Sequence, residues 1–396
     1  MVSSLDPFLY NEKVRLLAPP ALKNTALGFI TIMALLMALT VQPLVGQWSD
    51  RTRSRWGKRA PYLTVGAAGV SVALVIIVTA DSLWLLVMGA MLVSTFSNTT
   101  QSPWQALIPD EVPVTQRGTA AGIKTVLELV GIVSGVVLAG FTLARGNLWG
   151  APVVAITLFW IILAITLFTL FHSGQISHTA HQIGAVNPLR QLVHALKHAP
   201  RPFYWWMINR FLFWSAAIAI RTFMLNYLED VMGITPAEAQ ALGAQLFLVL
   251  GAGVFLLALP AGAIADRIGR RPILMMAGLL ASTGTAIFIV WPSLIMLYVA
   301  GALIAVGAGI FASASWALAT DLAPASEGAL YLGLANSAGV IGSIGGRLGG
   351  PLIDGINQLF QTVTLGYLVV FGIAALFFAA SSAAVLKMPA KSKREL

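Results

Sequence analysis

Long apolar stretches separated by short polar segments run through the whole of the 396-residue chain. A bilayer core of about 30 Å needs about 20 apolar residues in each helix that crosses it. Stretches of that length, bounded by charges, prolines or glycine turns, predict eleven membrane spans at residues 25–45, 61–80, 83–105, 118–143, 150–171, 203–228, 241–264, 272–292, 294–318, 329–351 and 362–386. The pattern therefore predicts an all-α polytopic membrane protein.

Composition supports this prediction and excludes several kinds of chemistry. Hydrophobic residues make up 58% of the chain and charged residues 10%, whereas a soluble domain carries about 25% charged residues. The absence of cysteine excludes disulfides and cysteine-ligated metal centres. The sequence has no phosphate-binding loop or serine nucleophile elbow, and its five histidines fall within 172–200 without a second cluster to complete a metal site. We therefore expect no enzyme activity, no cofactor and no metal.

Basic residues predict the orientation, because cytoplasmic loops collect lysine and arginine. One set of loops and ends holds seventeen of them, and the opposite set holds four, Lys13, Arg15, Lys23 and Arg145. The richer set includes the basic tail 388–396, so we expect a multi-pass cell-membrane protein with a cytoplasmic C-terminus and with residues 1–24 outside. The net charge of +9 then follows from topology and does not indicate a nucleic-acid partner.

A sequence motif occurs twice, once in each half of the chain. Gly46-Gln-Trp-Ser-Asp50-Arg51 with Gly57-Lys58-Arg59 is repeated as Gly262-Ala-Ile-Ala-Asp266-Arg267 with Gly269-Arg270-Arg271. A second pair of similar segments is Trp104-Gln-Ala-Leu-Ile-Pro-Asp110 and Trp316-Ala-Leu-Ala-Thr-Asp321. The repeat predicts two pseudo-repeated helix bundles. They would comprise residues 25–172 with five spans and 203–387 with six, joined by a cytoplasmic linker at 173–202.

At these residues the chain resembles the major facilitator superfamily, whose signature loop between its second and third helices has the pattern Gly-x-x-x-Asp-Arg-x-Gly-Arg-Arg. The second copy follows that pattern closely, and the first carries a four-residue insertion. The longer form is similar to that of the glycoside-pentoside-hexuronide:cation symporters and the related sucrose/proton symporter-like carriers. The resemblance covers essentially the whole chain. It implies the major facilitator fold and a transporter with its binding site between two bundles.

The charged residues of both loops are candidates for a conformational latch. A carboxylate at a helix end, with arginine or lysine a few residues on, forms charge-assisted hydrogen bonds to neighbouring helix ends, and glycines permit the tight turn. The alternative is that the basic residues only set topology and meet lipid headgroups. The predicted latch residues are Asp50, Arg51 and Arg59 in the first copy and Asp266, Arg267 and Arg270 in the second.

Two features depart from the family pattern. Only one predicted span precedes Gly46, because the charges and prolines of residues 1–24 oppose a crossing. The first family helix is therefore expected to be missing, through a late start codon, a truncation or a genuine eleven-span protein. In addition, the sodium-coupled relatives have an acidic pair ending in Asp-Pro before the loop, whereas this chain reads Gln42-Pro43-Leu44-Val45-Gly46. Gln42 supplies no anionic oxygen, so the resemblance favours protons over sodium.

Three predicted spans each carry polar residues on one face at 100° per residue. Amides and guanidinium groups direct hydrogen bonds and tryptophan offers a flat apolar surface, as a sugar ring requires. The resemblance to the family implies that these helices line the cavity. The alternative is polar contact between helices. The residues predicted to bind substrate are Asn98, Gln101 and Gln105 in the first of these spans, Trp214 and Arg221 in the second, and Trp316 in the third. Arg210 shares the face of Trp214, but its place nearer the cytoplasmic end suggests snorkelling.

Glu128 is the carboxylate placed deepest inside a predicted span, about 16 Å from Arg117 at a rise of 1.5 Å per residue. Burial opposes its charge and a nearby Arg221 would favour it, so Glu128 could exchange a proton. We predict that Glu128 couples transport to protons. The alternatives are a static buried ion pair and contact with another polar helix neighbour.

Together these features predict a secondary active transporter that moves a small polar organic solute, preferably a sugar or glycoside, by alternating access coupled to protons. Its partners would be that solute, the proton and the lipid bilayer. One alternative is an exporter of amphipathic compounds, which would require a less polar cavity. The other is a transport-inactive membrane scaffold or receptor.

Overall fold

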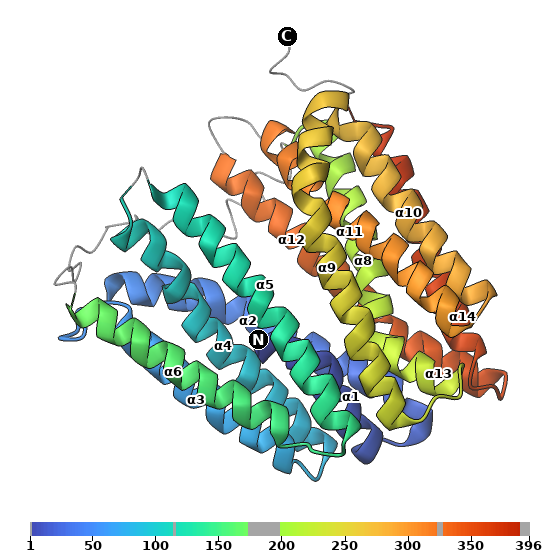
Figure 1. Ribbon diagram of the computed structural model, residues 1–396, viewed down its shortest axis with the longest axis horizontal. Coiled ribbons are helices and arrows are strands. Elements are labelled where there is room, and N and C mark those ends of the chain that lie inside the picture. The colour runs from blue at the N-terminus through green and yellow to red at the C-terminus, as the bar shows by residue number, and fades with distance from the viewer. Residues whose placement is uncertain (1, 114–115, 173–198, 323–327, 389–396) are drawn as a thin grey trace. The chain divides into compact units, whose positions relative to one another are not determined.

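Helices make up the regular structure of the computed structural model, which describes residues 2–113, 116–172, 199–322 and 328–388 (Figure 1). Within these ranges there is no β-strand. The chain divides into two compact units, Met1–Gly184 (unit 1) and Ala185–Leu396 (unit 2). Unit 1 contains α1 (Val2–Leu17), a short 3-10 helix (Pro20–Leu22), α2 (Lys23–Arg51), α3 (Ala60–Thr79), α4 (Leu83–Glu111), α5 (Arg117–Ala144) and α6 (Gly150–His172). Unit 2 contains α8 (Arg201–Asp230), α9 (Pro236–Ile268), α10 (Arg270–Val290), α11 (Leu294–Leu322), α12 (Gly328–Arg347), α13 (Gly349–Leu359) and α14 (Leu365–Val385).

Each predicted span overlaps a helix, with ends that differ by a few residues. Nine helices in the described part of the chain are long and apolar enough to cross a membrane. In α5 the apolar portion is shorter, Val130–Ala144, and the predicted span 329–351 is divided between α12 and α13 at Leu348. The all-α membrane fold is confirmed, and the number of eleven spans stays a prediction. Most of the predicted linker 173–202 and most of the tail 388–396 lie outside the described residues.

Local sequence signals set several helix ends. The Ser82 side chain accepts a hydrogen bond from the Leu85 amide at the start of α4. At the start of α9, Thr235 and Glu238 form a reciprocal capping box that satisfies two otherwise unpaired backbone donors. Gly269 ends α9 with a φ of +91°, a conformation that glycine adopts without steric cost.

The two units share one pattern of helix packing. In unit 1, α4 packs against α2 and α3, α1 against α5, and α6 against α3. In unit 2, α11 packs against α9 and α10, α8 against α12, and α14 against α10. Helices α1 to α6 therefore correspond, in order, to α8, α9, α10, α11, α12 and α14. The two copies of the sequence motif lie at corresponding places, between α2 and α3 and between α9 and α10.

Helix α1 corrects one detail of the expected fold. The first family helix was expected to be missing, yet α1 packs on α5 as α8 packs on α12. The placement of residues 1–24 outside the membrane stays a prediction. Phe8 and Leu9 are buried, and so is Lys13, at 5% exposed. The Lys13 ammonium donates to the carbonyls of Val78 (3.0 Å) and Ala80 (2.6 Å) at the end of α3, where the helix dipole favours a cation. One of the charges that argued against a membrane crossing is thus satisfied by a helix end.

Candidate functional site

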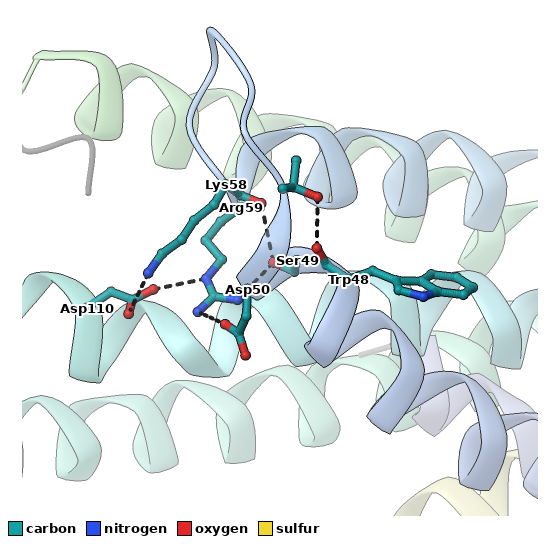
Figure 2. A network of polar contacts seen from close by, with 7 residues as sticks. Trp48, Ser49, Asp50, Lys58, Arg59 and Asp110 are labelled. Atoms are coloured by element: carbon teal, nitrogen blue, oxygen red, sulfur yellow. Dashed lines mark hydrogen bonds and ion pairs between the residues drawn. The ribbon is translucent and has the colours of Figure 1, made fainter. Parts of the chain in front are cut away.

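A network of ion pairs and hydrogen bonds joins the ends of α2, α3 and α4 in unit 1, and Figure 2 shows its side chains. We call it the Arg59 network; its members are Ser49, Asp50, Lys58, Arg59 and Asp110. The Arg59 guanidinium lies 2.7 Å from an Asp50 oxygen and 2.9 Å from an Asp110 oxygen, and it donates to Ser49 Oγ at 2.8 Å. Lys58 donates to the second Asp110 oxygen at 3.1 Å. One guanidinium therefore bridges two helices that are far apart in sequence.

The local sequence explains how these side chains meet. Asp50 lies in the last turn of α2, Gly57 turns the following loop with a φ of +81°, and Arg59 immediately precedes α3. The fully buried Ser49 accepts from Arg59 and donates to the Lys58 carbonyl at 3.3 Å. The arginine side chain is 8% exposed, so its contacts are largely shielded from water and weigh more than those of a surface pair.

Three members of the network, Ser49, Lys58 and Asp110, were not among the predicted latch residues. Asp110 lies in the last turn of α4, 51 positions from Arg59, and Ser49 directly precedes Asp50. A signal for Asp110 exists in the sequence, because the segment that ends at Asp110 recurs as the segment that ends at Asp321. Of the predicted members, Asp50 and Arg59 are paired, whereas Arg51 is exposed at the end of α2.

The second copy of the loop is described only in part. Arg267 is exposed, Arg270 is partly buried at the start of α10, and the Asp266 side chain lies outside the described residues. Arg271 donates to the Leu386 carbonyl at 2.8 Å, which ties the start of α10 to the end of α14. This contact to another helix end comes from an arginine that was not predicted as a latch residue.

The polar stripe of α4 is divided between helix contacts and exposed positions. Ser94 donates to the Ala34 carbonyl of α2, and Asn98 donates to the Ser94 carbonyl of its own helix at 2.8 Å. Gln105 is partly buried and Gln101 is exposed. Ser94 thus follows the alternative of polar contact between helices, while Gln101 and Gln105 leave their amides for other partners.

On the polar face of α8, the structure buries a different arginine from the one that was predicted. Arg221 is exposed, whereas Arg210 is 5% exposed. The Arg210 guanidinium carbon lies 4.5 Å from the ring centroid of Trp316 on α11 and 5.5 Å from that of Trp206. These are cation–π distances. Trp214 and Trp316 were predicted for the site; Arg210, which was left out, contacts Trp316 and lies one helical turn from Trp214.

Glu128 pairs with a lysine of its own helix. The Glu128 carboxylate lies 3.3 Å from Lys124 Nζ, and the glutamate side chain is 39% exposed. Lys124 also lies 5.3 Å from the ring centroid of Trp104, which connects α5 with α4. The carboxylate that was predicted to exchange protons therefore has a charged partner one turn away and remains accessible. Among the described residues, no group of three or more His, Cys, Asp or Glu side chains could hold a metal ion.

Sequence comparison finds a family and several relatives. The model of the Major Facilitator Superfamily matches residues 16–346 and, in a second match, residues 223–395. The sucrose transport protein SUC3 of Arabidopsis thaliana is 31% identical over 130 residues, which cover 27% of this chain and 22% of that protein. The lactose permease of Leuconostoc lactis is 36% identical over 64 residues, which cover 15% of this chain and 10% of that protein. The alignments thus span 22% or less of these relatives.

Solved structures with the same fold cover nearly the whole chain. A bacterial homologue of the human lysosomal transporter Spinster, in an inward-facing and occupied conformation, matches with a TM-score of 0.71 at 16% identity and covers 97% of this chain and 94% of its own. The nucleoside transporter NupG matches with a TM-score of 0.71 at 13% identity and covers 97% of each chain. These identities establish a shared fold.

Proposed function

The chain belongs to the Major Facilitator Superfamily, and from this premise we propose that it moves a sugar or glycoside across the cell membrane by alternating access coupled to protons. Membership makes the protein a membrane transporter and not an enzyme. One observation carries the proposal of a sugar. The relatives of this chain include proteins named for two different disaccharides, sucrose and lactose.

The side chains of the candidate site support a polyhydroxylated solute. The amides of Gln101 and Gln105 on α4 take no part in the hydrogen bonds described above for Ser94 and Asn98. In unit 2, Trp214 and Trp316 provide flat apolar surfaces. Sugars are bound in proteins by directed hydrogen bonds together with aromatic surface. We propose that Asn98, Gln101 and Gln105 in unit 1, and Trp214, Arg221 and Trp316 in unit 2, contribute to substrate binding.

Proton coupling is proposed for Glu128. The Glu128 carboxylate is partly exposed and pairs with Lys124 at 3.3 Å. A proton can replace the lysine as the group that compensates its negative charge. Protonation would release the lysine from the pair and change the charge of α5 in a single step. This local change is the kind of event that biases a protein between two conformations.

The Arg59 network is proposed to act in conformational change and not in substrate binding. Its pairs fix the ends of α2, α3 and α4 to one another, and any movement of these ends must break charge-assisted bonds. We propose that Asp50, Arg51 and Arg59, with Asp266, Arg267 and Arg270 in the second copy, stabilise one conformation. The excess of basic residues in these loops supports a cytoplasmic position for them and for the C-terminus.

The proposal can be tested by ligand-induced stabilisation of the purified, lipid-reconstituted protein. A ligand that binds the folded state raises its stability by mass action, so a panel of disaccharides and glycosides should include compounds that raise the melting temperature in proportion to concentration. Lipophilic cations serve as the comparison. Stabilisation by these cations and by no saccharide would contradict the proposal and favour an exporter of amphipathic compounds.

A further inference from the structure

Lys124 has two partners of different kinds. Its ammonium lies 3.3 Å from the Glu128 carboxylate on α5 and 5.3 Å from the ring centroid of Trp104 on α4. The first contact is an ion pair, and the second is within the range of cation–π interactions. The lysine side chain is 24% exposed and the glutamate side chain 39% exposed, so protons can reach the pair.

The ion pair is of a kind that opens readily. Lys124 precedes Glu128 by four residues in the same helix. Pairs at this spacing contribute little to helix stability, and the order with lysine first is the weaker of the two. Partial exposure of both side chains weakens the attraction further. Addition of a proton to Glu128 therefore leaves the lysine ammonium without an anion.

The ring of Trp104 is held in place by other helices. It packs against a buried cluster formed by Leu63 and Ala67 of α3 and Leu163 of α6. A ring that is packed in this way presents a fixed face, whereas the lysine side chain is a flexible four-carbon stem with a charged end. Trp104 is therefore the stationary partner in this contact, and Lys124 is the mobile one.

The corresponding tryptophan of unit 2 also lies beside a cation. Trp104 of α4 and Trp316 of α11 begin the two similar segments that end at Asp110 and Asp321. The Arg210 guanidinium carbon lies 4.5 Å from the ring centroid of Trp316. The two cations come from helices that do not correspond, α5 in unit 1 and α8 in unit 2. What the two units share is therefore the aromatic ring itself, placed where it faces a cation.

Other described charged groups on the helices around α5 have partners of their own. The helices packed against α5 are α1, α4 and α6. Asp110 of α4 pairs with Lys58 and Arg59, and α6 contains no Asp, Glu, Lys or Arg and ends at the titratable His172. The charged groups of α1 bond within α1 or to the end of α3: Asp6 with Tyr10, Glu12 with Arg15, and Lys13 with the carbonyls of Val78 and Ala80. Among the described residues, Lys124 is therefore the cation that compensates Glu128.

We propose that Trp104 is a positioning residue that holds the Lys124 ammonium while Glu128 carries a proton. This inference rests on the proposed coupling of transport to protons through Glu128. When a proton binds, the carboxyl group becomes neutral and the ammonium stays on the indole face. When the proton leaves, the ammonium pairs with the carboxylate again. The ring thus keeps the cation beside the carboxyl group in both states, so that binding and release of the proton are reversible.

A double-substitution cycle tests the inference without any solute. Glu128→Gln imitates the protonated carboxyl group, and Trp104→Leu removes the aromatic face. Each single substitution leaves Lys124 with one partner, whereas the double substitution leaves it with neither. The double substitution should therefore lower the melting temperature of the purified protein by about 1–3 °C more than the sum of the two single effects.

Controls show whether the effect passes through Lys124. Trp84→Leu, at an exposed tryptophan of the same helix, should be additive with Glu128→Gln. In a Lys124→Gln background, the Trp104 and Glu128 substitutions should become additive as well. Trp104→Phe keeps an aromatic face, should fold even if Trp104→Leu does not, and should show a smaller excess. Additive effects with Lys124 present, or an excess that persists without it, would overturn the inference.

The pH dependence of transport gives a readout that a merely structural role would not change. Uptake of radiolabelled sucrose and lactose into proteoliposomes would be measured over a range of external pH. Trp104→Leu disfavours the state with protonated Glu128, because Lys124 depends on the ring in that state, so the profile should move to lower pH by roughly 0.5 pH unit. Lys124→Gln removes the cation that favours the ionised carboxylate, so the profile should move to higher pH.

The outcomes separate this inference from the proposed function. Shifts of the pH profile in the same direction for Trp104→Leu and Lys124→Gln, or no shift for Trp104→Leu, would contradict the positioning role. Uphill uptake by Glu128→Gln would defeat the proposed coupling and this inference with it. Loss of uphill uptake in Glu128→Gln, together with additive effects in the cycle, would defeat this inference alone.

Discussion

At the scale of single residues, Arg59 has the largest number of polar partners in its network, because it contacts Asp50, Asp110 and Ser49 at once. Arg59→Ala leaves Asp50 without its ion pair and Ser49 without its donor. Since the Asp50 side chain is partly exposed, we expect the free energy of unfolding to fall by about 2–3 kcal/mol, which is at or below the range for breaking a buried pair. Transport should slow by roughly tenfold or more while solute affinity changes little, since about 1.4 kcal/mol corresponds to a factor of ten in rate.

The exposed Arg55 of the same loop provides the control for this comparison. Arg55→Ala should leave both turnover and affinity close to those of the unmodified protein, as surface charges contribute little. Turnover and equilibrium binding would be measured on the same reconstituted samples. An Arg59→Ala protein with unchanged turnover, or one that loses affinity in proportion to rate, would show that the network does not govern conformational change.

Glu128 provides a second prediction at this scale. Glu128→Gln removes the titratable group and the pair with Lys124, so proton-driven uphill accumulation should disappear while exchange of solute across the membrane continues. Accumulation and counterflow exchange in proteoliposomes separate these activities. Glu12→Gln, which disrupts a comparable pair with Arg15 on α1, should retain both. Uphill uptake by Glu128→Gln would exclude it as the coupling residue.

The candidate site was predictable from sequence only where a motif or a helical period carried the signal. The pairing of Asp50 with Arg59 follows from the motif itself. Asp110 required knowledge of which helix ends meet, which the repeat of its segment only suggests. Exposure was not predictable: Arg210 and Arg221 share one face of α8, yet the structure buries the first and exposes the second. Burial depends on neighbours such as Trp316 that come from another helix.

At the scale of elements, α1 depends on Lys13 for its attachment to α3. Lys13→Met keeps much of the side-chain volume but removes the donors to Val78 and Ala80. Two carbonyls at the end of α3 would then lose a charged donor, at an expected cost of about 1–3 kcal/mol. Thermal unfolding in detergent measures this loss. Arg15→Gln, whose pair with Glu12 is exposed, should change the melting temperature far less, and an equal effect of both substitutions would contradict the capping role of Lys13.

Close contact of α8 with α12 depends on Gly346. A methyl group there would lie 2.4 Å from the Ser215 carbonyl oxygen and 2.8 Å from the Ala219 nitrogen, so the two helices would have to separate. Gly346→Ala should destabilise the protein by about 1–3 kcal/mol, as overpacking does. Gly372→Ala on α14, where no atom lies within 4 Å, should cause no loss. Equal melting temperatures for the two variants would contradict the packing in unit 2.

The sequence predicted the apolar helices more reliably than it predicted α1. Hydropathy identifies a helix that is apolar over 20 residues, because lipid contact imposes that composition. Helix α1 carries Asp6, Glu12, Lys13 and Arg15, and its charged groups are satisfied by partners such as the end of α3. Partners of this kind are set by tertiary packing, and a pattern of apolar positions contains no information about them.

At the scale of the whole molecule, the repeat is the feature on which the account depends most. The order of helix contacts in unit 1 recurs in unit 2, and the two copies of the motif fall at matching loops. Internal repeats of this kind are the basis of alternating access in transporters. A proton-coupled transporter built in this way moves a solute against its gradient, which neither a scaffold nor a receptor does.

Solute accumulation driven by a proton gradient tests this central claim most directly. Proteoliposomes with an acidic exterior would be supplied with radiolabelled sucrose, lactose or a synthetic glycoside. We predict that at least one of these solutes accumulates above its external concentration and that a protonophore abolishes the accumulation. Accumulation of none of them, or uptake that is the same with and without the gradient, would contradict the account.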